Sequence, residues 1–220
     1  MTATQPDTTA ADRAQTFIDW TKINARALGV GAAIVVVAAA GYWFYARSRE
    51  IQSANAEKAL LQAKQSMSAW NLALAQSDLQ KVFSRWESTS AGVEAAMLLA
   101  QLDFDAGKYQ DGLTKLQKAA GTGPAAQSQS TIESLEGDGY AQMGKMAEAA
   151  KAYQRAADAT PYEIEKAFQR AKAARAFQSA GDVASAKAIW TQLATDPKSQ
   201  TMAAEARIRL GELDAQAAKR

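Results

Sequence analysis

The stretch SLEGDGYAQMGKMAEAAKAYQRAAD, residues 134–158, contains the pattern that predicts the fold. Within it, Gly144 opens the phrase Gly144-Lys145-Met146, and an alanine-rich run follows. Comparable phrases open at Gly107 and at Gly181, and each of these glycines stands 37 residues from Gly144. A fixed period of this size is typical of stacked helical repeats, which present an extended surface to another chain.

A series of small residues has the same period. One stands seven residues before each turn glycine, and the series continues once more near the C-terminus. Its members are Ala100, Gly137, Ala174 and Gly211. Small residues at a helix crossing let two backbones approach closely. We expect the larger side chains of Tyr153 and Trp190 to fill the space between neighbouring repeats.

Each unit is interpreted as two helices joined by a turn. The glycines are expected to adopt the left-handed backbone that closes the first helix, and Pro161 and Pro197 to stop the second helix. This order of small, aromatic, glycine and proline positions resembles the tetratricopeptide repeat. That repeat usually spans 34 residues, so we expect the additional residues in connections such as 121–124 and 196–198.

The predicted fold class is all-α, with an N-terminal transmembrane helix followed by a right-handed tetratricopeptide-like solenoid. The expected parts are a short cytoplasmic leader at 1–27, a transmembrane helix at 28–45 and the repeat domain at 46–220. The first repeat, 46–90, is degenerate because the pattern fades before Val93. The later elements are repeats from about 93, 130 and 167 and a capping helix at about 199–217, which shields the end of the array.

The predicted membrane segment reads LGVGAAIVVVAAAGYWFY, residues 28–45, and contains no charge. As a helix it would be about 27 Å long, close to the roughly 30 Å core of a bilayer. A cleaved signal peptide cut near Ala38-Ala39-Ala40 is the alternative, but the long leader and the aromatic cluster 42–45 favour an uncleaved anchor. Lysine and arginine flank both ends, so charge alone leaves the orientation undecided.

Composition narrows the function classes. The formal net charge is +2, which gives no basic field for nucleic acid, and the chain contains neither cysteine nor histidine. Thiol nucleophiles, imidazole bases and the usual zinc or haem ligands are therefore excluded. The carboxylates of Asp103, Asp105, Glu163 and Glu165 are interpreted as solvated helix charges rather than catalytic groups. We expect no enzyme activity, no cofactor and no metal site.

Candidate partner-binding residues follow from the repeat register, because positions two, five, nine and twelve of each first helix face the concave groove. The candidates are Glu94, Met97, Gln101, Phe104, Asp138, Phe168, Arg175 and Gln178. The apolar members Met97, Phe104 and Phe168 either contact a segment of a partner or pack on the anchor-proximal helices or the C-terminal cap, and both readings stay open. Trp70 lies near a turn, where its ring can be exposed.

Three segments in order resemble a known family: FIDWTKINARALGVGAAIVVVAAAGYWFYARS, GVEAAMLLAQLDFDAGKYQDGLTKLQKA and the stretch at 134–158. The chain is similar to bacterial single-span inner-membrane proteins that are ancillary subunits of the SecYEG translocon (YfgM-like). The resemblance implies a cytoplasmic N-terminus and a C-terminal domain in the periplasm. It also implies association with translocon subunits, with periplasmic chaperones or prolyl isomerases, and with emerging exported chains. It carries over no catalytic residue.

Two other roles fit the same sequence. One is a tetratricopeptide adaptor for envelope assembly or cell division, which would have different protein partners. The other is a regulator that acts through its leader, residues 1–27, on a cytoplasmic factor. All three roles are protein binding, and none requires a small-molecule substrate.

Overall fold

The structure is a computed structural model that describes residues 10–218, and within them the backbone is helical and contains no strand. The α-helices are α1 (Ala10–Ile23), α2 (Ala25–Ser68), α3 (Leu72–Arg85), α4 (Ser90–Asp105), α5 (Tyr109–Ala120), α6 (Gln129–Gln142), α7 (Met146–Ala159), α8 (Glu163–Ser179), α9 (Val183–Thr195) and α10 (Gln200–Ala217). Two short 3-10 helices, η1 (Gly123–Ser128) and η2 (Pro197–Ser199), precede α6 and α10. The chain forms two compact units, which divide after Ile51.

The first unit contains the apolar segment predicted to cross a membrane. Residues 28–45 lie within α2, and the large apolar side chains described there are exposed, from 57% at Tyr45 to 74% at Tyr42. Among the described residues, α2 is the one helix long and apolar enough to cross a membrane, and its most apolar window is not buried. That exposure separates it from the core helix of a soluble protein, whereas a signal sequence would have the same properties.

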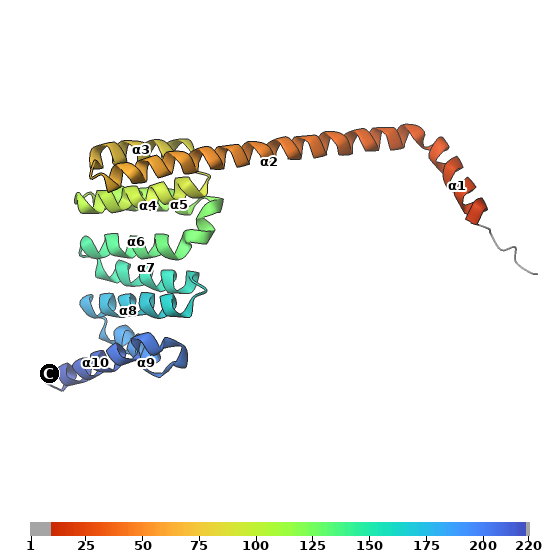
Figure 1. Cartoon of the computed structure of the whole chain (residues 1–220). Coiled ribbons are helices and arrows are strands. Elements are labelled where there is room, and N and C mark those ends of the chain that lie inside the picture. The colour runs from red at the N-terminus through yellow and green to blue at the C-terminus, as the bar shows by residue number, and fades with distance from the viewer. Residues whose placement is uncertain (1–9, 219–220) are drawn as a thin grey trace, which may run out of the picture. The chain divides into compact units, whose positions relative to one another are not determined.

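The second unit is a stack of helical hairpins. Figure 1 shows the helices from α3 to α10 following one another in chain order through the stack. The hairpins are α4–α5, α6–α7 and α8–α9, and α10 follows as a last helix. The C-terminal part of α2 packs on α3 and α4 through Ala56, Leu60 and Ala63, which lie in one core cluster with Leu79.

The left-handed turns predicted from the sequence are confirmed. Gly107, Gly144 and Gly181 have φ angles of 73°, 74° and 83°. After each glycine, the next N–H donates back to a carbonyl in the last turn of the first helix, as Lys145 does to Tyr140 at 2.9 Å. This is the hydrogen-bond pattern by which a left-handed residue closes a helix.

Tyr153 packs between neighbouring repeats, as predicted, since it lies in one core cluster with Ala171 and Ala174 of α8, and it also packs within its own repeat. Its ring lies where a side chain at position 137 would be, since a Cβ on Gly137 would come within 2.4 Å of a ring carbon. Two helices, α6 and α7, therefore approach closely because residue 137 has no side chain.

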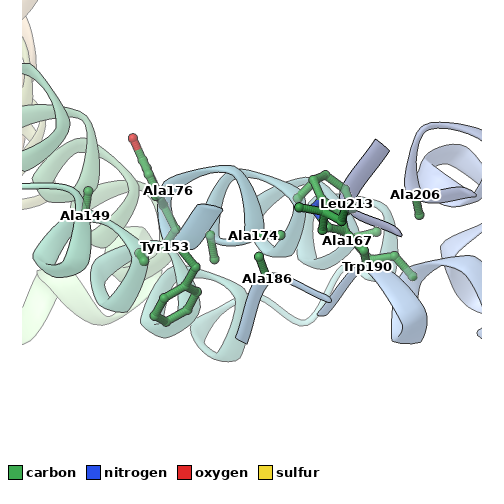
Figure 2. Close-up of a cluster of buried hydrophobic side chains, with 14 residues drawn as sticks. Ala149, Tyr153, Ala167, Ala174, Ala176, Ala186, Trp190, Ala206 and Leu213 are labelled. Atoms are coloured by element: carbon green, nitrogen blue, oxygen red, sulfur yellow. The ribbon is translucent and has the colours of Figure 1, made fainter. Parts of the chain in front are cut away.

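Trp190 also has the packing role predicted for it. Its side chain is fully buried, in a cluster with Ala167, Ala174 and Leu213. Figure 2 shows this cluster, to which α7, α8, α9 and α10 all contribute. The ring thus joins the third repeat to the last helix.

Gly211 continues the series of small residues in sequence but not in packing. It lies exposed within α10, and a Cβ added there would have no neighbouring atom within 4 Å. Within the described residues no helix follows α10 to pack against it at this position, so nothing there requires a small residue.

The extra residues of the 37-residue period occur in two different ways. The expected connections at 121–124 and 196–198 overlap the short helices η1 and η2. Between the second and third repeats the connection is short instead. The period of 37 residues would place the start of α8 at position 166, the equivalent of Gln129 in α6, but α8 begins about one turn earlier, at Glu163. The first turn of α8 therefore extends beyond the corresponding end of α6.

Gly144→Val tests the repeat turn. A β-branched side chain is strained at a φ of 74°, so we expect the free energy of unfolding to fall by about 1–3 kcal/mol. Thermal unfolding followed by circular dichroism measures the change. The matched control is Gly211→Val, which places the same side chain in open space within a helix and should leave the melting temperature nearly unchanged. Equal melting temperatures for both variants would contradict the assigned turn.

Candidate partner-binding face

The first helices of the repeats expose one surface, here called the first-helix face: the side of α4, α6, α8 and α10 on which side chains bridge neighbouring first helices. The bridges are Lys64–Glu94 between α2 and α4, Lys172–Asp138 at 2.7 Å between α8 and α6, and Arg175–Glu205 at 2.7 Å between α8 and α10. These contacts span successive repeats and therefore fix the relative positions of the first helices.

Seven of the eight residues predicted to bind a partner keep at least part of their side chain at the surface. The exposed ones are Gln101 and Phe168, and the half-buried ones are Glu94, Met97, Asp138, Arg175 and Gln178. The bridges bring Glu94, Asp138 and Arg175 into contact with the adjacent repeats. These polar candidates therefore have structural partners within the chain.

Phe104 is a core residue, and its assignment to the binding face is corrected. Only 4% of it is exposed. Its ring occupies the space that side chains at Gly112 and Gly139 would need, because a Cβ at these positions would lie within 2.5 Å and 2.7 Å of ring atoms. Met97 packs against the same core cluster from its edge. Phe104 therefore packs between α4, α5 and α6, and not on the anchor-proximal helices or the C-terminal cap as the alternative reading expected.

Asp138 is the centre of a polar network on α6. One carboxylate oxygen accepts hydrogen bonds from the Tyr153 hydroxyl and from the Lys172 ammonium, both at 2.7 Å. Lys172 also donates to Ser134 at 3.1 Å and lies 4.4 Å from the centre of the Tyr153 ring. Burial, and then the hydrogen bond to Asp138, raise the pKa of Tyr153, which therefore stays a neutral donor.

Arg175 connects α8 to the last helix. Its guanidinium donates to both carboxylate oxygens of Glu205, with two distances of 2.7 Å. The same group lies 6.0 Å from the centre of the Trp190 ring. Planar two-point pairing is the strongest geometry for a guanidinium and a carboxylate, so Arg175 is held in place.

The α8 apolar patch, defined as Tyr162, Ile164 and Phe168, is a group of three exposed large apolar side chains at the start of α8. The exposed fractions are 70%, 69% and 48%. Ile164 and Phe168 are one helical turn apart, so they share one side of α8. Sequence reasoning found Phe168 but missed the other two residues. The available signal was the apolar i, i+4 pair beside a proline at the start of a helix.

The carboxylates near this patch have structural roles. Glu165 accepts hydrogen bonds from Ser130 at 2.9 Å and from Thr160 at 2.8 Å, and so ties the start of α8 to α6. Glu163 pairs with Lys198 at 3.5 Å. Across the described residues, no group of three or more acidic side chains is arranged to hold a metal ion. These contacts hold the patch in place.

The chemical capacity of the face follows from its charges and its apolar patch. The bridging cations of this face, Lys64, Lys172 and Arg175, already pair with carboxylates of the same chain. An acidic partner would have to displace those carboxylates, whereas an apolar partner would only remove water from the patch. The arrangement therefore suits an apolar segment of another protein.

Comparison with known protein families identifies a tetratricopeptide repeat-like domain. Residues 54–172, just over half of the chain, match the model of the tetratricopeptide repeat-like domain. A comparison with curated proteins gives no match. Domains of this class are typically non-catalytic protein-binding modules. On the strength of the matched repeats, the chain belongs to the tetratricopeptide repeat-like domain family.

Proposed function

We propose that the chain is a membrane-anchored scaffold that links the Sec translocon to periplasmic chaperones or prolyl isomerases, which receive exported chains. In this proposal residues 1–27 lie in the cytoplasm, 28–45 cross the bacterial inner membrane, and 46–220 form the periplasmic repeat domain. The observation that carries the proposal is the α8 apolar patch, which leaves Ile164 and Phe168 exposed on a face whose bridging cations are paired within the chain.

The apolar part of α2 supports the anchor. An exposed helix with a mean hydropathy of 2.0 over its most apolar window is unfavourable in water and favourable in a bilayer. Anchoring also raises the local concentration of the repeat domain near other membrane proteins, so a modest patch is sufficient for association.

The sequence resemblance supports the choice of partner. The order of leader, apolar helix and repeats is that of the ancillary translocon subunits, and the family match covers residues 54–172 of the repeat domain. Recovery of envelope-assembly or cell-division proteins in place of channel subunits would favour the adaptor role. Loss of function on deleting only residues 1–27 would favour the regulator.

Phe168→Ala tests the patch. We expect recovery of channel subunits with the tagged full-length chain to fall by about tenfold, because aromatic anchors dominate binding energies. Phe168 is 48% exposed, so the melting temperature should change little. Quantified co-purification from solubilised membranes and thermal unfolding give the two readouts.

The matched control for this variant is Val183→Ala, which truncates a side chain of 39% exposure on α9. It should leave recovery unchanged. Unchanged recovery with Phe168→Ala would remove the patch from the binding site, and a large loss of stability would assign Phe168 to the core instead.

Salt dependence tests how the patch binds. Because the cations of the first-helix face are paired within the chain, we expect recovery to change by less than about twofold between 50 and 500 mM salt. The same co-purification measures it. A steep decline with salt would show that charged contacts to the partner dominate.

Topology tests the location. A C-terminal tag on the full-length chain should be digested by protease in spheroplasts, and the intact mass should show that residues 28–45 are retained. The control is a cytoplasmic protein, which must stay protected until lysis. A tag digested only after lysis would place the repeats in the cytoplasm and refute the proposed role.

A further inference from the structure

The C-terminal part of α2 and α3 form a further hairpin, here called the first hairpin, and Trp70 occupies the position of the turn glycine in it. It stands 37 residues before Gly107, and its φ is 57°, the only positive value of a non-glycine residue in the described chain. The closing hydrogen bonds are those of the other turns: Asn71 N–H donates to Ser66 at 3.0 Å and Trp70 N–H to Met67 at 2.9 Å. A bulky residue is rare in this backbone region, and such outliers concentrate at functional sites.

The side chain of Trp70 is presented to solvent. It is 85% exposed, and Leu72 and Leu74 beside it are 47% and 45% exposed. The segment 65–77 around this turn contains no charged residue. The other three turns each carry a charge directly after the glycine, at Lys108, Lys145 and Asp182. The first hairpin therefore ends in an uncharged tip that exposes an aromatic ring and two leucine side chains.

A pocket of about 320 Å³ lies beside the same hairpin, between α2 and α4. It is lined by Glu57, Leu60, Leu61, Lys64, Ser90, Ala91 and Glu94. Leu60 and Ala91 are buried and provide an apolar base, and the Lys64–Glu94 pair lies at the rim. The volume has room for one indole ring, and the rim carboxylates can accept a hydrogen bond from its N–H.

The Trp70 ring, after the C-terminal end of α2, and the pocket between α2 and α4 do not meet within one chain, since Trp70 is 85% exposed. A second copy of the chain has the same ring and the same pocket, so the ring of each copy can enter the pocket of the other. A twofold axis between two hairpins brings each ring to the other pocket at once and closes the assembly as a dimer. An interface about such an axis brings like surfaces together, which a segment without charge tolerates best.

We propose that the chain forms a reciprocal dimer in which Trp70 of each copy inserts into the α2–α4 pocket of the other. This contact is separate from the α8 apolar patch and does not depend on the identity of the partner proposed above. It assigns a function to the Trp70 turn, and it places Glu94, predicted from the sequence to bind a partner, at the rim of the dimer contact.

The test measures energy transfer between full-length chains in phosphatidylcholine vesicles. The natural chain contains no cysteine, so Gln80→Cys on the exposed side of α3 supplies one label position for a donor or an acceptor. Diluting the protein in lipid gives the density at which half of the dimer dissociates. For the labelled chain without further changes, we expect energy transfer above the level that chance encounters give. This transfer should be lost when the protein is diluted in lipid.

Trp70→Gly restores the residue that the other turns use, so the fold should be kept and the melting temperature should not fall. We expect the protein density in lipid at which half of the dimer dissociates to rise by about thirtyfold, because the variant removes an aromatic hot spot of the interface. Trp70→Asn should have the same effect. Leu61→Glu, at an exposed lining residue of the pocket, should have the same effect. The control is Ile208→Asn, which removes a 63% exposed apolar side chain from α10 and should dimerise normally.

Mixing the variants separates ring-in-pocket insertion from contact between two tips. Donor-labelled Trp70→Gly keeps its pocket, and acceptor-labelled Leu61→Glu keeps its ring, so one of the two contacts is restored. The mixture should therefore show more transfer than either variant alone. Chance-level transfer for the unmodified chain, undiminished transfer for Trp70→Gly, or no gain on mixing would each overturn the proposal.

Discussion

The contact between aromatic rings and glycine backbones is the constraint on which the repeat array depends. The ring of Tyr153 lies over Gly137, and that of Phe104 lies over Gly112 and Gly139. A larger residue at any of these glycines would separate two helices, because densely packed cores cannot absorb the added volume. The polar network depends on the same spacing, since the Tyr153 hydroxyl reaches Asp138 only while its ring lies against α6.

The fold could be predicted from the sequence where its cause is local. Each turn glycine and the residues after it determine a left-handed closure, and φ values between 73° and 83° agree with that reading. The burial of Phe104 could not be predicted in this way. It depends on Gly139, which belongs to the next repeat, so the register of one helix gives no indication of it. Pairs between repeats such as Arg175–Glu205 have the same non-local origin.

The first hairpin shows tertiary packing overriding a local preference. A sequence search for turn glycines misses the turn of this hairpin, because Trp70 stands at the glycine position. A left-handed backbone costs a residue that has a side chain about 1–2 kcal/mol. The helices on either side nevertheless keep the repeat register, with Ala63 and Leu79 fully buried in one core cluster. Their packing maintains the turn, and the ring at its tip is left exposed.

The internal ion pairs of the first-helix face decide which contacts a partner can exploit. Lys172 and Arg175 each hold a carboxylate of the chain at 2.7 Å, so an acidic partner would exchange one good pair for another and gain little. Ile164 and Phe168 have large exposed fractions, and complete burial of such a side chain is worth about 1.5–3 kcal/mol relative to full exposure. The charges therefore position the repeats, and the apolar patch supplies the favourable free energy of binding.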